Sequence, residues 1–114
     1  MQIHLTSDEI ILTLISLIRA VDPRMLQQGP EGFSVDFERI DKKKPPLTND
    51  ELLLLKLRAV LERAENAGPL PLELEAVEGR RLAGTLERLE GLQMWPPDVL
   101  AMSASIRGRL GEVK

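Results

Sequence analysis

The chain has 114 residues, of which 43% are hydrophobic and 29% charged, and its net charge is −3. This length predicts one small domain, 1–114, able to bury a core, and the composition excludes disordered, fibrous and collagen-like proteins. Cysteine is absent, which excludes disulfides, thiolate metal sites and thiol nucleophiles. The first residues lack the charge and apolar length of a signal peptide or membrane span, so we expect a cytoplasmic protein with no membrane partner.

A strand and a long helix are expected at the start of the chain. Residues 1–5 alternate apolar and polar side chains, as a half-buried strand does. Thr6 and Glu9 have the spacing of a capping box, which predicts a helix from there to about residue 21. Because this helix is apolar at nearly every azimuth, we expect it to be buried on more than one side.

The rest of the chain predicts two more strands and three more long helices. A second capping box, formed by Thr48 and Glu51, marks the start of one of these helices. The expected elements are a helical turn at 24–28, a strand at 33–39, a charged proline-stopped loop at 41–46, a helix at 48–66, a strand at 70–75, and helices at 77–90 and 95–110.

Together these elements predict a two-layer α+β fold. A small three-stranded sheet would have one polar face, and four main helices would pack on the other. We expect mixed strand pairing, because parallel sheets are normally buried on both faces and these strands are not. The polar positions of the second and third strands would then form one acidic face, made by Asp36, Glu38, Glu73 and Glu75.

This acidic face has two functional interpretations besides that of a solvated surface. Grouped carboxylates favour the docking of a basic protein partner. Carboxylate oxygens also suit divalent cations, and His4 could join them from the first strand, which gives a divalent-cation-binding domain or enzyme as a second alternative, although no acidic loop with metal-ligand spacing is present. Trp95, beside two prolines, is either an interface anchor or a ring that plugs the core.

The basic residues support a nucleic-acid-binding alternative. Each basic cluster has acidic neighbours in the sequence, and the chain has only three aromatic residues for base stacking, which disfavours this interpretation without removing it. The residues that would form such a patch are Lys42, Lys43, Lys44, Arg80, Arg81, Arg107 and Arg109.

The hypothesis that these patterns favour is a non-catalytic protein-interaction or regulatory module of a bacterium or phage. No nucleotide-binding or hydrolase motif is present, so we expect no enzyme activity and no cofactor. A homodimer is also expected, because the core of so short a chain would leave part of the first long helix uncovered. Ten arginines against five lysines are compatible with a GC-rich or heat-adapted bacterial source.

Overall fold

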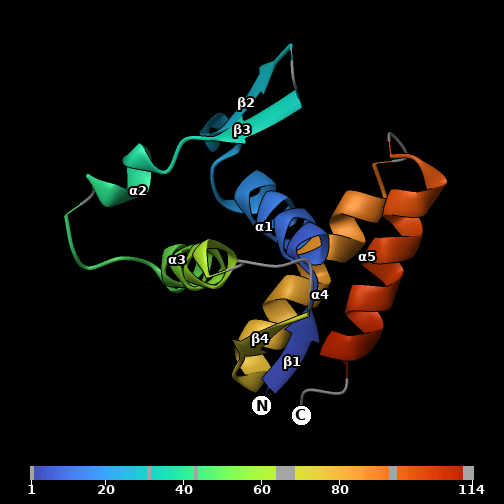
Figure 1. Ribbon diagram of the computed structural model, residues 1–114. Coiled ribbons are helices and arrows are strands. Elements are labelled where there is room, and N and C mark those ends of the chain that lie inside the picture. The colour runs from blue at the N-terminus through green and yellow to red at the C-terminus, as the bar shows by residue number, and fades with distance from the viewer. Residues whose placement is uncertain (1, 31, 43, 64–68, 93–94, 112–114) are drawn as a thin grey trace.

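The computed structural model describes residues 2–30, 32–42, 44–63, 69–92 and 95–111 (Figure 1). In chain order the elements are β1 (Gln2–Leu5), α1 (Ser7–Val21), the 3₁₀ turn η1 (Pro23–Met25), β2 (Leu26–Gly29), β3 (Gly32–Val35), α2 (Glu38–Asp41), α3 (Asn49–Glu62), β4 (Leu70–Glu73), α4 (Ala76–Glu90) and α5 (Pro97–Leu110). The α+β class is confirmed. None of these helices has the length and apolarity needed to span a lipid bilayer.

The strands form two separate antiparallel pairs instead of one mixed three-stranded sheet. β1 pairs with β4, with Ile3 opposite Leu72, and β2 pairs with β3, with Leu26 opposite Val35. A helical turn does form at Pro23–Met25, but the second half of the expected turn at 24–28 belongs to the strand Leu26–Gly29, and the difference arises there. This strand supplies β3 with a neighbour of its own, so β3 does not join β1 and β4.

β3 is also shorter than the expected strand at 33–39. The backbone N–H of Asp36 donates to the carbonyl of Met25 at 2.8 Å, and the Asp36 carboxylate accepts a hydrogen bond from the Glu38 N–H at 3.1 Å. An aspartate that bonds the backbone two residues ahead favours a turn over a continued strand. Glu38 therefore begins the short helix α2.

Both predicted capping boxes are confirmed. The Glu9 N–H donates to the Thr6 hydroxyl at 3.2 Å, and the Thr6 N–H donates to the Glu9 carboxylate at 2.9 Å. Thr48 and Glu51 repeat these bonds at the same two distances. These bonds satisfy N–H groups that the first turn of a helix cannot pair internally. The expected end of the second capped helix, near residue 66, lies outside the described residues.

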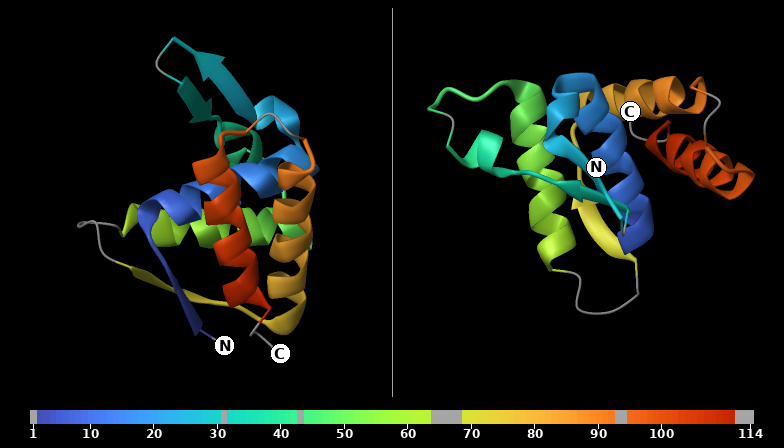
Figure 2. Two further views of the ribbon diagram at one scale, coloured as in Figure 1. Left: turned by 90° about the vertical axis from the view of Figure 1, so that its right-hand side faces the viewer. Right: turned by 90° about the horizontal axis from the view of Figure 1, so that it is seen from above.

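α1 is the centre of the fold, and its predicted burial on several sides is confirmed. It packs against α3 on one side and α4 and α5 on the other, with the β1–β4 pair near its first residues (Figures 1 and 2). Of the expected apolar stretch from Ile10 to Ile18, Ile11 is the exposed member, at 41%. The chain thus covers its own long helix, which removes the reason given above for a homodimer. The dimer itself stays a prediction.

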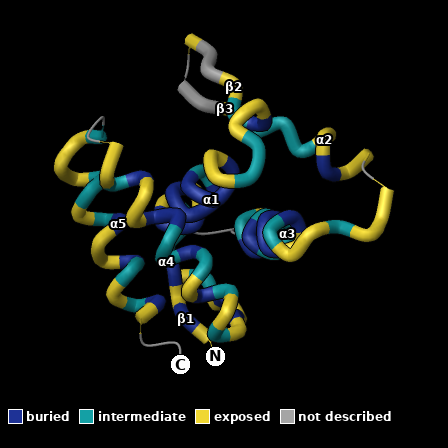
Figure 3. Tube along the Cα trace, turned by 180° about the vertical axis from the view of Figure 1, so that it is seen from behind, coloured by how far each residue is buried: buried dark blue, intermediate teal, exposed yellow. Residues whose placement is uncertain are grey.

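α2 docks on α3 through a few side chains. The Arg58 guanidinium lies over the Phe37 ring, 4.9 Å from its centroid, and donates to both carboxylate oxygens of Asp41 at 3.0 and 3.1 Å. Ile40 is buried beneath them. Most other described residues from β3 to the start of α3 are half-buried or exposed (Figure 3).

Candidate functional site

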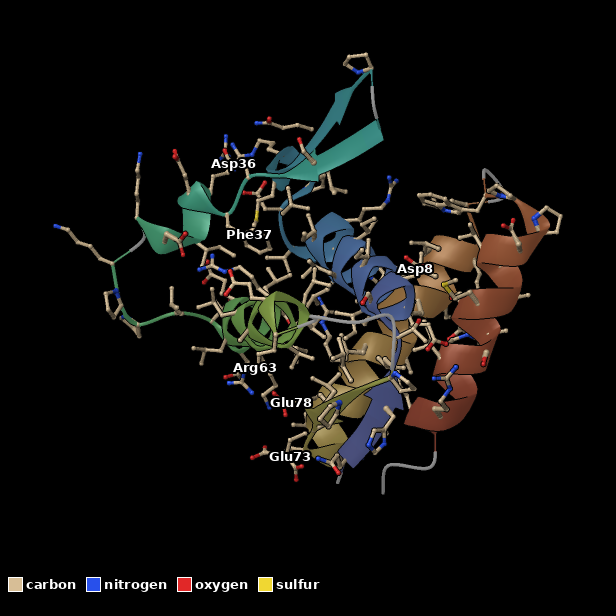
Figure 4. The ribbon with its side chains drawn as sticks, viewed as in Figure 1. Asp8, Asp36, Phe37, Arg63, Glu73 and Glu78 are labelled. Carbon is tan, nitrogen blue, oxygen red and sulfur yellow. The ribbon has the colours of Figure 1, made fainter. Side chains whose placement is uncertain are left out.

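The four acids expected to share one sheet face are divided between different parts of the molecule. Asp36 follows β3 and Glu38 lies on α2, whereas Glu73 lies on β4 and Glu75 precedes α4. Asp36 and Glu73 lie on opposite sides of α3 (Figure 4). The single acidic face is therefore absent, because β3 pairs with β2 and not with β4.

Four of the cations proposed for nucleic-acid binding are bound to acids of the same chain. The pairs are Lys42 with Glu38, Arg81 with Asp50, Arg107 with Glu90, and Arg109 with Glu9. Their charges are balanced locally, which weakens the electrostatic attraction that phosphate binding needs. Lys44 and Arg80 are exposed and have no acidic partner in the described part of the chain, and Lys43 lies outside it.

Trp95 and His4 differ in how far they are buried. Trp95 is half-buried against the core, and its indole N–H is buried without an acceptor among the described residues. His4 is exposed on β1, and its carbonyl accepts a hydrogen bond from Arg109 at 2.9 Å. Within the described ranges, no group of three histidine or acidic side chains is arranged to hold a metal ion.

The structure instead forms a cleft of about 370 Å³ between α3 and the start of α4, here called the α3–α4 cleft. Leu52 and Val77 line it and are 52% and 60% exposed, more than the other large apolar side chains of the described chain. The complete lining is Asn49, Asp50, Leu52, Leu53, Lys56, Glu75, Val77, Glu78 and Arg81.

Two ion pairs join the walls of this cleft. Arg81 donates to both carboxylate oxygens of Asp50 at 3.0 Å, and Lys56 donates to both oxygens of Glu78 at 2.8 and 3.0 Å. Burial raises the pKa of Glu78, but the Glu75 N–H and the Lys56 ammonium together lower it by more than burial raises it. The pKa of Glu78 is therefore below the ordinary value of 4.5. Glu78 is thus a carboxylate at neutral pH, and the charged walls are held in place.

A second cleft, of about 280 Å³, continues along α3 beside β4. Lys56 lines both clefts, which makes them neighbours on one surface. The lining of the second cleft is Gln2, Lys56, Ala59, Val60, Arg63, Pro71 and Glu73. Arg63, Glu73 and Glu78 lie on this same side of α3 (Figure 4). We call the two clefts together the α3 trough. From Asn49 to Arg63 it follows α3 for about 20 Å, at about 1.5 Å per helical residue.

Three of the residues singled out from the sequence, Glu73, Glu75 and Arg81, line this surface, but its apolar members were not predicted. A signal for Leu52 was present in the run of four leucines at 52–55. Successive helical residues turn by about 100°, so four consecutive leucines cannot all face one core. Val77 carried no comparable signal, because its exposure depends on how α4 approaches α3.

No protein-family model, curated protein or solved structure matches this chain. The chemistry of the trough then indicates what it can do. The lining residues given above have no hydroxyl, thiol or imidazole side chain, and Asp50, Lys56 and Glu78 are held in ion pairs. They combine exposed apolar side chains with charges fixed by ion pairs. This combination is typical of a surface that binds another macromolecule.

Proposed function

We propose that this chain is a non-catalytic protein-interaction module, acting in the cytoplasm of a bacterium or phage-infected cell, and that the α3 trough receives an amphipathic helix of its partner. The observation that carries the proposal is the exposure of Leu52 and Val77 in one cleft between two ion pairs.

The energetic advantage of covering the two side chains supports this role. Full burial of a leucine or valine side chain contributes about 1.5–3 kcal/mol. Since Leu52 and Val77 are about half exposed, covering them would contribute about 1 kcal/mol each. An apolar centre ringed by polar groups that exclude water is also the arrangement in which binding hot spots occur.

The shape and chemistry of the trough favour a helix as the bound segment. The walls of the α3–α4 cleft are helices whose backbone groups are largely paired, so a partner is recognised by side chains and not by strand addition. A length of about 20 Å matches a helix of about 14 residues. Glu75 is exposed at the rim and forms no ion pair within the described chain, which favours a basic residue beside the partner's apolar anchor.

The test is a pull-down from a lysate of the native host, with the wild-type protein and with variants of the trough as bait. We expect wild type and Ile11→Glu to retain the same stoichiometric partner, and Leu52→Glu and Val77→Glu to lose it. Ile11 is the matched control, because it is a large exposed apolar residue on α1 that lines neither cleft. Equal retention by all four proteins would refute the proposal.

Sedimentation of the purified chain tests whether the trough instead binds a second copy of the chain. A dimer at high micromolar concentration that Leu52→Glu abolishes would show that the trough binds a second copy of the chain. That result would overturn the proposal that the trough receives a partner's helix.

A further inference from the structure

A third cleft, away from the α3 trough, lies between the last turns of α1 and α4. Its volume is about 190 Å³. Its lining is Ser16, Arg19, Ala20, Thr85, Arg88, Leu89 and Leu92. This lining holds two arginines and no acid, although the chain as a whole has a net charge of −3.

The two arginines differ from most others in the chain. Six of the ten arginines form ion pairs with acids, whereas the guanidiniums of Arg19 and Arg88 have no partner among the described residues. Asp22, the acid that follows α1, is bound by Arg24 at 3.0 Å and by Arg39 at 3.7 Å. No acid lies three or four residues from Arg88. Asp22 lies three residues after Arg19 but beyond the last residue of α1, so neither arginine has an acid on its own helix at the spacing of an ion pair.

Two unpaired cations that line one small cleft repel each other and favour an anion between them. The carbonyl ends of α1 and α4 offset part of this repulsion, because positive charge is stabilised in the last turn of a helix. A guanidinium presents a planar set of N–H donors that fits the two oxygens of a carboxylate. The mouth of the cleft therefore has the chemistry of an anion site.

The floor determines how an anion would be oriented. Ser16 and Thr85 are each 2% exposed and lie 3.1 Å apart, oxygen to oxygen. Ser16 also contacts the Thr13 carbonyl at 2.7 Å, and Thr85 contacts that of Leu82 at 2.9 Å. Two hydroxyl protons serve these three contacts, so the floor has lone pairs to offer but no free proton. A carboxylate head would be repelled there, and it must face the two arginines.

The rest of the lining is apolar and comes from Ala20, Leu89 and Leu92. The cleft volume equals about six water molecules at about 30 Å³ each, which sets the size of a ligand at about six non-hydrogen atoms. We propose that this cleft binds a small organic carboxylate, with its head between Arg19 and Arg88 and its apolar body against Ala20 and Leu89. This site is separate from the α3 trough and does not depend on its role.

The test is an NMR titration of the ¹⁵N-labelled chain with butyrate, butyramide and inorganic phosphate. We expect butyrate to shift the amide signals of residues 16–20 and 85–92 in a saturable way, and butyramide of the same shape to leave them unchanged. Phosphate should bind more weakly than butyrate, because it has no apolar body. Arg19→Gln and Arg88→Gln should each weaken butyrate binding about tenfold, the effect of losing one charged hydrogen bond.

Arg80→Gln is the matched control, since Arg80 is another exposed, unpaired arginine of α4 that lies outside the cleft. It should bind butyrate as wild type does. The proposal is overturned if butyrate does not saturate, if butyramide gives the same shifts, if phosphate binds as tightly as butyrate, or if Arg80→Gln weakens binding as much as the two cleft variants do.

Discussion

The ion pair between Arg109 and Glu9 ties α5 to the corner where β1 leads into α1. One Arg109 nitrogen donates to a Glu9 oxygen at 3.0 Å and to the His4 carbonyl at 2.9 Å. The other terminal nitrogen donates to the second Glu9 oxygen and to the Ser105 hydroxyl at 3.1 Å. Replacing Arg109 by methionine removes these bonds and keeps most of the apolar stem.

The expected cost follows from how far the pair is buried. The Glu9 side chain is 10% exposed and that of Arg109 is 36% exposed. Breaking a fully buried pair costs about 3–5 kcal/mol, while a surface pair contributes about 0–1 kcal/mol. Glu9 also keeps its bond from the Thr6 N–H after the change. We therefore expect Arg109→Met to lower the free energy of unfolding by about 2 kcal/mol.

Urea unfolding followed by far-ultraviolet circular dichroism measures this loss. With a slope of about 1–3 kcal/mol per molar urea, the midpoint should fall by about 1 M. Arg80→Met, which alters an unpaired arginine, should stay within about 0.5 kcal/mol of wild type. In a double-mutant cycle, Arg109→Met should cost less when Glu9 is already glutamine. Equal stability of Arg109→Met and Arg80→Met would refute the reasoning.

Three further predictions concern the core, the caps and pH. Leu54→Ala should cost about 2–5 kcal/mol by urea unfolding, because Leu54 is fully buried, whereas Leu52→Ala should cost far less. A similar cost for both would contradict the burial pattern. Thr48→Ala should lose about 1 kcal/mol and Thr48→Ser should not, as judged by thermal melting. Burial raises the pKa of Glu9, but hydrogen bonds from Arg109 and Thr6 lower it by more, so the pKa lies below its ordinary value. The pKa of Glu90 is also lowered, by Arg107 and Ser103, against the opposing effect of burial. Below about pH 4.5 the unfolded chain binds more protons than the folded chain, so the free energy of unfolding should decrease as the pH is lowered. The decrease should be less steep in Glu90→Gln. Stability independent of pH between 5 and 3 would contradict these shifts.

Local signals in the sequence predicted the long helices α1, α3, α4 and α5 but not the short helix α2, which begins inside the expected strand at 33–39. The bonds of Thr6 with Glu9 and of Thr48 with Glu51 depend only on neighbours three residues apart, so their residue types were sufficient to place α1 and α3. The apolar azimuths of α1 likewise predicted a helix covered on several sides.

Strand pairing depends on distant residues, and here sequence reasoning was less successful. The short segment at 26–29 has no strict alternation, so its pairing with β3 was not predicted, and the acidic face that assumed another pairing is absent. The α3 trough depends on how α4 and β4 lie beside α3. Only the excess of leucines at 52–55 indicated that this helix would expose an apolar side chain.

The measurement that tests the central claim most directly is photo-cross-linking from inside the trough. A photoreactive phenylalanine analogue replaces Leu52 in one protein and Ile11 in another, and the cross-linked peptides are identified after irradiation in the native host. The account predicts that position 52 cross-links to one partner segment with helical amphipathic spacing and a basic residue beside its apolar anchor, while position 11 does not. Cross-links to that segment from position 11 alone, or with equal yield from both positions, would contradict it.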